Sequence, residues 1–152
     1  MNIIQEHMRA MLSNEQRPSG RKLHEWRAIT IEKNLVKTAE GSARVHFGES
    51  EVIAGVKLSI GEPFPDTPED GALMVNMELI PMANPEFESG PPGIDAIEIS
   101  RQVDKVVRES GIIDMSKLCI EKGKKVWVVS IDIIPINADG NLIDLATLAA
   151  IA

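Results

Sequence analysis

The chain has 152 residues, of which 43% are hydrophobic and 26% are charged, and its net charge at neutral pH is −7. This length and balance predict one soluble globular domain with enough sequence to bury a core. The acidic charge excludes a free-standing nucleic-acid binder of the usual basic type. Any contact with RNA or DNA must therefore be local, or shared with a more basic partner.

Composition also limits the compartment and the kind of binding surface. No apolar run approaches the roughly 18 residues that cross a bilayer, so we expect no membrane partner. A single cysteine, Cys119, has no internal disulfide partner, which favours a reducing, cytoplasmic location. The chain has two Trp, three Phe and no Tyr, which leaves little material for the aromatic platform of a single-strand binder.

The N-terminal half is predicted to form a helix followed by an antiparallel meander. Apolar residues recur at helical spacing over residues 3–12, and a polar lead-in occupies residues 17–27. Alternating, β-branched sequence then predicts strands, with turns at Lys33-Asn34 and Gly48-Glu49. These three strands are expected over residues 28–33, 35–47 and 51–60.

In the C-terminal half, Pro- and Gly-rich loops flank a fourth strand over residues 72–82. A helix over 96–110 follows, with Asp95 in its first turn and Gly111 at its end. Two further strands (117–123 and 125–136), a turn at Asp139-Gly140 and an apolar helix from residue 141 complete the pattern. Because the chain ends inside this apolar helix, we expect residues 1–152 to be the N-terminal portion of a single longer domain, whose further strands would cover the helix.

The residues that usually carry catalysis or metal binding form no convincing constellation. The three histidines (His7, His24 and His46) are far apart, and none has a second ligand at zinc spacing. Phosphate-binding glycine loops are absent. Cys119 lies in an apolar strand and is predicted to be a buried small hydrophobe. We therefore expect no metal, no cofactor and no catalytic residue.

The helix over 96–110 is the most informative segment. Its predicted buried stripe contains Ala96, Ile99, Val103, Val106 and Val107. Arg101, Lys105 and Arg108 fall on the opposite side, with Ile94 and Ile97 nearby. One interpretation is a solvated face paired with Asp104 and Glu109. The other is a ladder of cations about 5–6 Å apart that suits successive phosphates of a nucleic-acid strand, with the two isoleucines facing a neighbouring subunit.

Successive segments from Arg17 to the end resemble the RNase PH-like family, and within it the non-catalytic ring subunits of archaeal exosomes. The segments are GRKLHEWR, AEGSARVHFGESEVIAGVK, PFPDTPEDG, ELIPMANPEFESGPP, AIEISRQVDKVVRES and GKKVWVVSIDI with DGNLIDLATLAA. The resemblance implies an α+β, two-layer RNase PH fold related to the second domain of ribosomal protein S5.

The resemblance also implies partners. Three copies would alternate with three copies of a catalytic RNase PH-like subunit in a hexameric ring of heterodimers. Single-stranded RNA would thread through the channel and be degraded from its 3′ end by phosphate attack. Cap subunits with S1 or KH domains would cover one face.

Site residues follow from one helical segment. The family pattern E-L-A-R-V-V-D-R corresponds here to EISRQVDK, so the resemblance implies RNA backbone contacts at Arg101 and Lys105. Lys105 stands where the pattern usually has arginine and lacks its planar fork, so the Arg101 contact should be the more specific one. Arg108 matches the family too, but only its ladder position argues for an RNA contact.

Two alternatives stay open at this stage. The chain could be an autonomous, homo-hexameric RNase PH-like phosphorolytic exoribonuclease. Alternatively, it could be a scaffold without RNA contact, in which Arg101 and Lys105 pair with acidic side chains of a neighbour.

Overall fold

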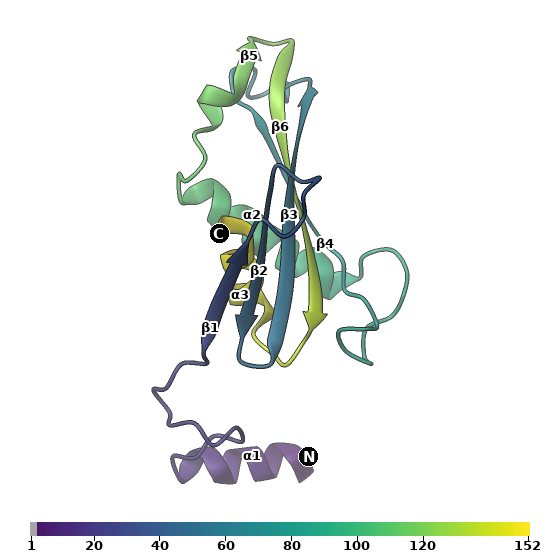
Figure 1. Cartoon of the computed structure of the whole chain (residues 1–152). Helices are drawn as coiled ribbons and strands as arrows, with labels where there is room; N and C mark the ends of the chain where they lie inside the picture. The colour runs from purple at the N-terminus through teal and green to yellow at the C-terminus, as the bar shows by residue number, and fades with distance from the viewer. Residues whose placement is uncertain (1–2) are drawn as a thin grey trace.

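A computed structural model describes residues 3–152 and shows a curved sheet with two helices on one face (Figure 1). The helices are α1 (Ile3–Ser13), α2 (Ile94–Glu109) and α3 (Leu142–Ile151), with a 3-10 helix η1 (Met115–Leu118). The strands are β1 (Ile29–Lys33), β2 (Gly41–Phe47), β3 (Ser50–Gly61), β4 (Ala72–Met77), β5 (Cys119–Glu121) and β6 (Lys125–Asn137).

The sheet is mixed, with the strand order β1-β2-β3-β6-β4 and with β5 paired to β6. The predicted antiparallel meander of β1, β2 and β3 is confirmed, and its second turn uses Gly48 at φ +67°. β6 pairs antiparallel with β3 along most of its length and parallel with β4 on its other side. The strand that arrives last in the chain therefore lies between two earlier ones.

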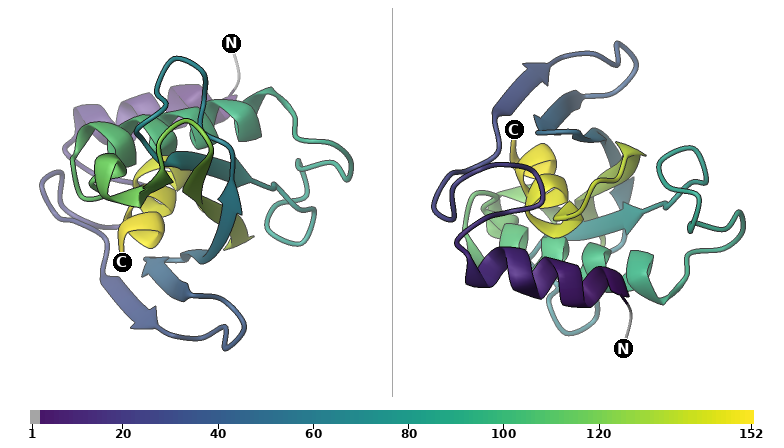
Figure 2. Two further views of the ribbon diagram at one scale, coloured as in Figure 1. Left: turned by 90° about the horizontal axis from the view of Figure 1, so that it is seen from above. Right: turned by 90° about the horizontal axis from the view of Figure 1, so that it is seen from below.

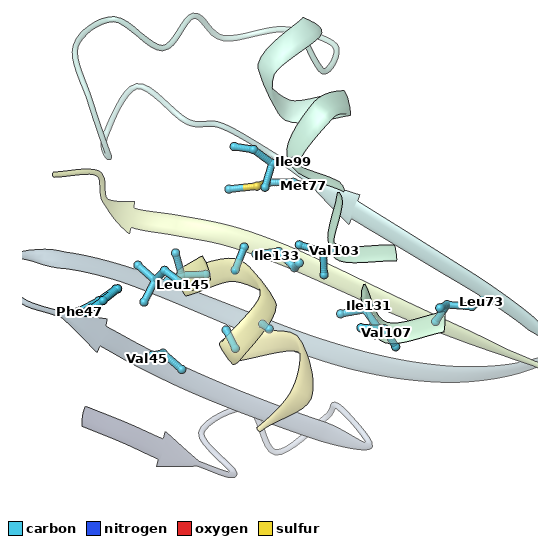
Figure 3. Close-up of a cluster of buried hydrophobic side chains, with 14 of the residues drawn as sticks. Val45, Phe47, Leu73, Met77, Ile99, Val103, Val107, Ile131, Ile133 and Leu145 are labelled. Atoms are coloured by element: carbon cyan, nitrogen blue, oxygen red, sulfur yellow. The ribbon is translucent and has the colours of Figure 1, made fainter. Parts of the chain in front are cut away.

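The core lies between the sheet and the helix pair (Figure 3). Alternating residues of β2 and β6, such as Val45, Ile131 and Ile133, point to the helix side, as the period of two in a strand requires. Val103 of α2 and Leu145 of α3 meet them from the other layer. The predicted two-layer α+β architecture is confirmed.

α3 packs on the sheet of the described residues. Leu145, Ala146 and Ala149 are buried, and Figure 2 shows the sheet curving around this helix with α2 alongside. The small alanine side chains allow the helix to approach the strands closely. The sheet thus covers one face of α3, whereas Ile143 and Ile151 on its other side are exposed.

Three predicted strands differ in extent from the observed ones. β2 begins at Gly41 and not at residue 35, because the preceding residues turn, with the Val36 N–H bonded to Ser42 Oγ at 2.9 Å. β4 ends at Met77, short of the predicted residue 82. The segment predicted as a strand over 117–123 is mostly η1 and a turn, with only the short β5 paired.

A hydrogen-bonded latch joins three parts of the chain at the lower end of the sheet. Ser50 is fully buried; its Oγ accepts from the Asp139 N–H and donates to Gly140 O, both at 2.9 Å. Arg27 donates from Nη1 to Asp139 O at 2.6 Å. The latch fixes the lead-in segment before β1 to the β2–β3 turn and to the turn that starts α3, whereas α1 lies beyond this end (Figure 1).

Candidate nucleic-acid interface

α2 presents the predicted cation stripe on a packed helix. Ala96, Ile99, Val103 and Val107 are buried against β4, β6 and α3. Gly111 adopts φ +67° just beyond the helix, as expected of a C-terminal glycine. This packing fixes the rotation of the helix, so the residues on its outward side have defined positions.

One prediction for this helix is wrong. Val106 was expected in the buried stripe, but its side chain is 43% exposed. At 100° per residue Val106 lies 60° from Val103, at the margin of the stripe, so the sheet covers Val103 and leaves Val106 partly open.

The three cations of the stripe have different partners. Arg108 forms a two-pronged ion pair with Asp104, with Nη2–Oδ1 at 2.8 Å and Nε–Oδ2 at 3.1 Å. The hydrogen bonds that Arg108 donates to the Asp104 carboxylate raise the pKa of Arg108 above its ordinary value. The exposed side chains of Arg101 and Lys105 make no ion pair or hydrogen bond within residues 3–152. The interpretation of a solvated face with paired charges therefore holds for Arg108. Arg101 and Lys105 remain available to bind a ligand.

Apolar side chains continue the outward face toward the start of α2. Ile94 is 84% exposed and Ile97 is 44% exposed. Around the helix axis, Ile94 lies on the mean direction of Arg101 and Lys105, and Ile97 lies about 60° from it. Exposed isoleucines are typical of a protein–protein interface, and unpaired cations are typical of a site that binds an anion. The outward face of α2 carries both kinds of residue side by side.

The other candidates contribute no site. Within residues 3–152, no three His, Cys, Asp or Glu side chains gather closely enough to hold a metal ion. Cys119 is half-buried on β5 and was predicted to be buried. The described helices include none with the length and apolar character needed to cross a membrane.

Sequence reasoning missed a second positively charged feature. Arg17, Arg21, Trp26, Arg27 and Phe47 line an open cavity of about 560 Å³ beside the start of α3. The signal was present in the sequence, since residues 17–27 carry four Lys or Arg and one Glu in a chain of net charge −7. That segment was interpreted only as a polar lead-in.

Comparisons with known proteins place this geometry in a family. Residues 25–152 match domain 1 of the 3′ exoribonuclease family, RNase PH. The chain belongs to the RNase PH family. The match spans every strand of the sheet together with α2 and α3.

Archaeal exosome proteins are among the similar relatives of this RNase PH family member. The exosome complex component Rrp42 of Methanocella arvoryzae is 54% identical over 150 residues, which cover 99% of this chain and 58% of the relative. A structure of the Archaeoglobus fulgidus exosome with RNA bound to the active site contains a chain with 47% identity and a TM-score of 0.94.

A second solved structure, an archaeal exosome core, matches with 43% identity and a TM-score of 0.87. These two structural matches cover 99% of this chain but only 59% and 56% of theirs. The chain therefore spans a little over half the length of the relatives it matches, and its fold is the RNase PH fold of these exosome structures.

Proposed function

We propose that the chain is a non-catalytic subunit of an archaeal-type exosome, a phosphorolytic 3′→5′ exoribonuclease complex. In this proposal it supplies the N-terminal portion of an RNase PH-like domain in a cytoplasmic ring of three heterodimers with a catalytic RNase PH-like subunit. It helps to shape the partner's active site, and cap subunits with S1 or KH domains cover one face. The high identity to proteins named Rrp42 supports this over an autonomous homo-hexamer.

The single observation that carries the RNA role is the difference in partners along α2. Arg101 and Lys105 are exposed, one helical turn apart and without partners in the described residues, whereas Arg108 is neutralised by Asp104. Two unneutralised charges at this spacing match two successive phosphates of a single strand. An acidic chain can hold RNA in this way when a more basic neighbour supplies the rest of the positive field.

The test is RNA binding by the complex assembled with its catalytic partner. Replacing both residues, Arg101→Ala with Lys105→Ala, should weaken binding and lower the slope of log affinity against log salt by about 1.4, at about 0.7 per phosphate. Lys33→Ala with Lys37→Ala is the matched control of equal charge change, because both lysines are exposed, lie outside α2 and have no side-chain partner in the described residues.

The same experiment distinguishes the proposed RNA contact from the alternative of a scaffold without RNA contact. If the double variant keeps the wild-type salt slope while the ring becomes less stable, Arg101 and Lys105 pair with a neighbouring protein and make no RNA contact. Phosphate-dependent trimming by the purified chain without a partner would instead support the autonomous enzyme.

A further inference from the structure

The cavity beside the start of α3 has the chemistry of a nucleotide site. Trp26 is 73% exposed and stacks on the buried Phe47, with ring centroids 6.2 Å apart and planes 17° from parallel. Phe47 supports one side of the indole and leaves much of the other open to a ligand. An aromatic ring held in this way is the platform on which a nucleobase stacks.

Two guanidinium groups lie in the same cavity and are held by neutral groups. Arg21 donates from Nη1 to Glu25 O and from Nε to Ser19 Oγ, both at 3.0 Å, and Arg17 donates to Leu23 O. Neither arginine forms an ion pair within residues 3–152, and the Nε–H of Arg17 is buried without a hydrogen-bond partner there. Their orientation is therefore fixed while their charge remains uncompensated, as a phosphate site requires.

The remaining wall of the cavity favours a nucleotide over an acidic peptide. The carboxylates of Glu25 and Asp144 accept hydrogen bonds from the Lys22 N–H at 3.0 Å and from Asn141 Nδ2 at 2.9 Å. These oxygens would repel an acidic peptide, but they can accept from a ribose hydroxyl or from a base amino group. Asn141 also brings the start of α3, with its free backbone N–H groups, to this wall.

We propose that this cavity binds one nucleotide, with its base on Trp26 and its phosphate at Arg17 and Arg21. The nucleotide would come from single-stranded RNA or from a free nucleoside diphosphate. This site uses none of the α2 residues, so it can be tested independently of the RNA contact at Arg101 and Lys105.

The test measures binding of a labelled single-stranded oligoadenylate, and separately of ADP, to the complete chain. Trp26→Ala should weaken binding about fivefold or more, which is the loss expected for one stacked base. Arg21→Ala should lower the salt slope for RNA by about 0.7, and Arg21→Lys should restore much of it because the charge returns. Lys37→Ala alone serves here as the control of equal charge change.

Tryptophan fluorescence distinguishes direct contact between the ligand and Trp26 from an indirect effect of a destabilised loop. Ligand should quench the wild-type emission, and Trp26→Phe should abolish the change while Trp127 continues to emit. Repeating the series with Arg101→Ala and Lys105→Ala present should give the same losses again, because the two sites share no residue.

Binding of either probe with loss in the Trp26 and Arg21 variants supports the proposal, and the probe that binds distinguishes a free nucleotide from a strand. The proposal is overturned if neither probe binds, or if Trp26→Ala and Arg21→Ala leave both affinities unchanged. Displacement of RNA by polyglutamate with no effect of Trp26→Ala would overturn it in favour of an acidic protein segment.

Discussion

The position of Asp104 determines which cations of α2 remain available to bind a ligand. In the sequence, Arg101, Lys105 and Arg108 look equivalent, since all three lie on one side of the helix. In the structure the carboxylate of Asp104, four residues before Arg108, engages both prongs of that guanidinium. Four residues before Arg101 the helix has Ile97, and Asp104, three residues after Arg101, is already bonded to Arg108, so Arg101 makes no ion pair in the described residues.

This difference gives a residue-scale prediction. Asp104→Ala frees the charge of Arg108, which then extends the cation stripe by a further turn. RNA binding by the assembled complex should gain about 0.7 in salt slope. The free energy of unfolding should fall by only about 0.5 kcal/mol, because the lost pair is partly solvated.

Titrations of RNA binding against salt and urea unfolding curves check the two halves of this prediction. Arg108→Ala is the companion variant, and it should leave the salt slope unchanged. A lower slope in that variant would mean that Arg108 contacts RNA despite its pairing with Asp104.

At the scale of elements, the sequence predicts α2 well because two signals agree there. Four of five expected stripe residues are buried, and Asp95 and Gly111 mark its ends within the expected limits. β5 could not be delimited in the same way. Its apolar residues follow η1, and a three-residue strand is too short for alternation to be distinguished from a turn.

The junction between η1 and β4 depends on one glycine. The Gly71 N–H bonds to Met115 O at 2.9 Å, and a Cβ at this residue would overlap Leu118 and lie 2.9 Å from Trp127 O. These neighbours are a packed side chain and a backbone carbonyl, so neither can move to accommodate the added Cβ without a cost in stability.

Gly71→Ala should therefore lower the free energy of unfolding by about 1–3 kcal/mol. Gly55→Ala is the matched control, because no atom lies within 4 Å of the Cβ it would add. Chemical denaturation of both variants checks the prediction, and equal stability of the two would show that the η1 junction relaxes freely.

At the scale of the molecule, the latch around Ser50 connects segments that are distant in the chain. Its hydroxyl satisfies backbone groups of Asp139 and Gly140, and Arg27 bonds to the same turn. Ser50→Ala should cost about 1–3 kcal/mol of unfolding free energy, because two buried backbone groups lose their partner. Ser59→Ala, an exposed serine of the same strand, should change stability by less than about 0.5 kcal/mol.

Thermal or urea unfolding of the Ser50 and Ser59 variants measures this difference. Ser50→Ala should also weaken nucleotide binding in the cavity, because Arg27 and the start of α3 form part of its wall. A stable Ser50→Ala variant would mean that water replaces the hydroxyl without loss.

Neither the strand order of the sheet nor the cavity beside Trp26 could be predicted from the sequence, and the reason is the same for both. Periodicity reports which face of a strand is buried, but not which strand lies beside it, so the parallel β4–β6 pair was not foreseen. The cavity likewise forms from residues that meet only through the fold, since Phe47 and Asn141 are far from Trp26 in the chain. The Arg101 and Lys105 contacts came from the family resemblance and stay predictions.

The position of β6 has a consequence for biosynthesis. β3 is complete at Gly61 and β4 at Met77, yet the strand that joins them starts at Lys125. Until the ribosome has released β6, both neighbours expose unpaired backbone edges and apolar faces that can pair with other nascent chains. Translational stalling between these points should therefore leave an aggregation-prone intermediate, on which holding chaperones would act before the sheet closes.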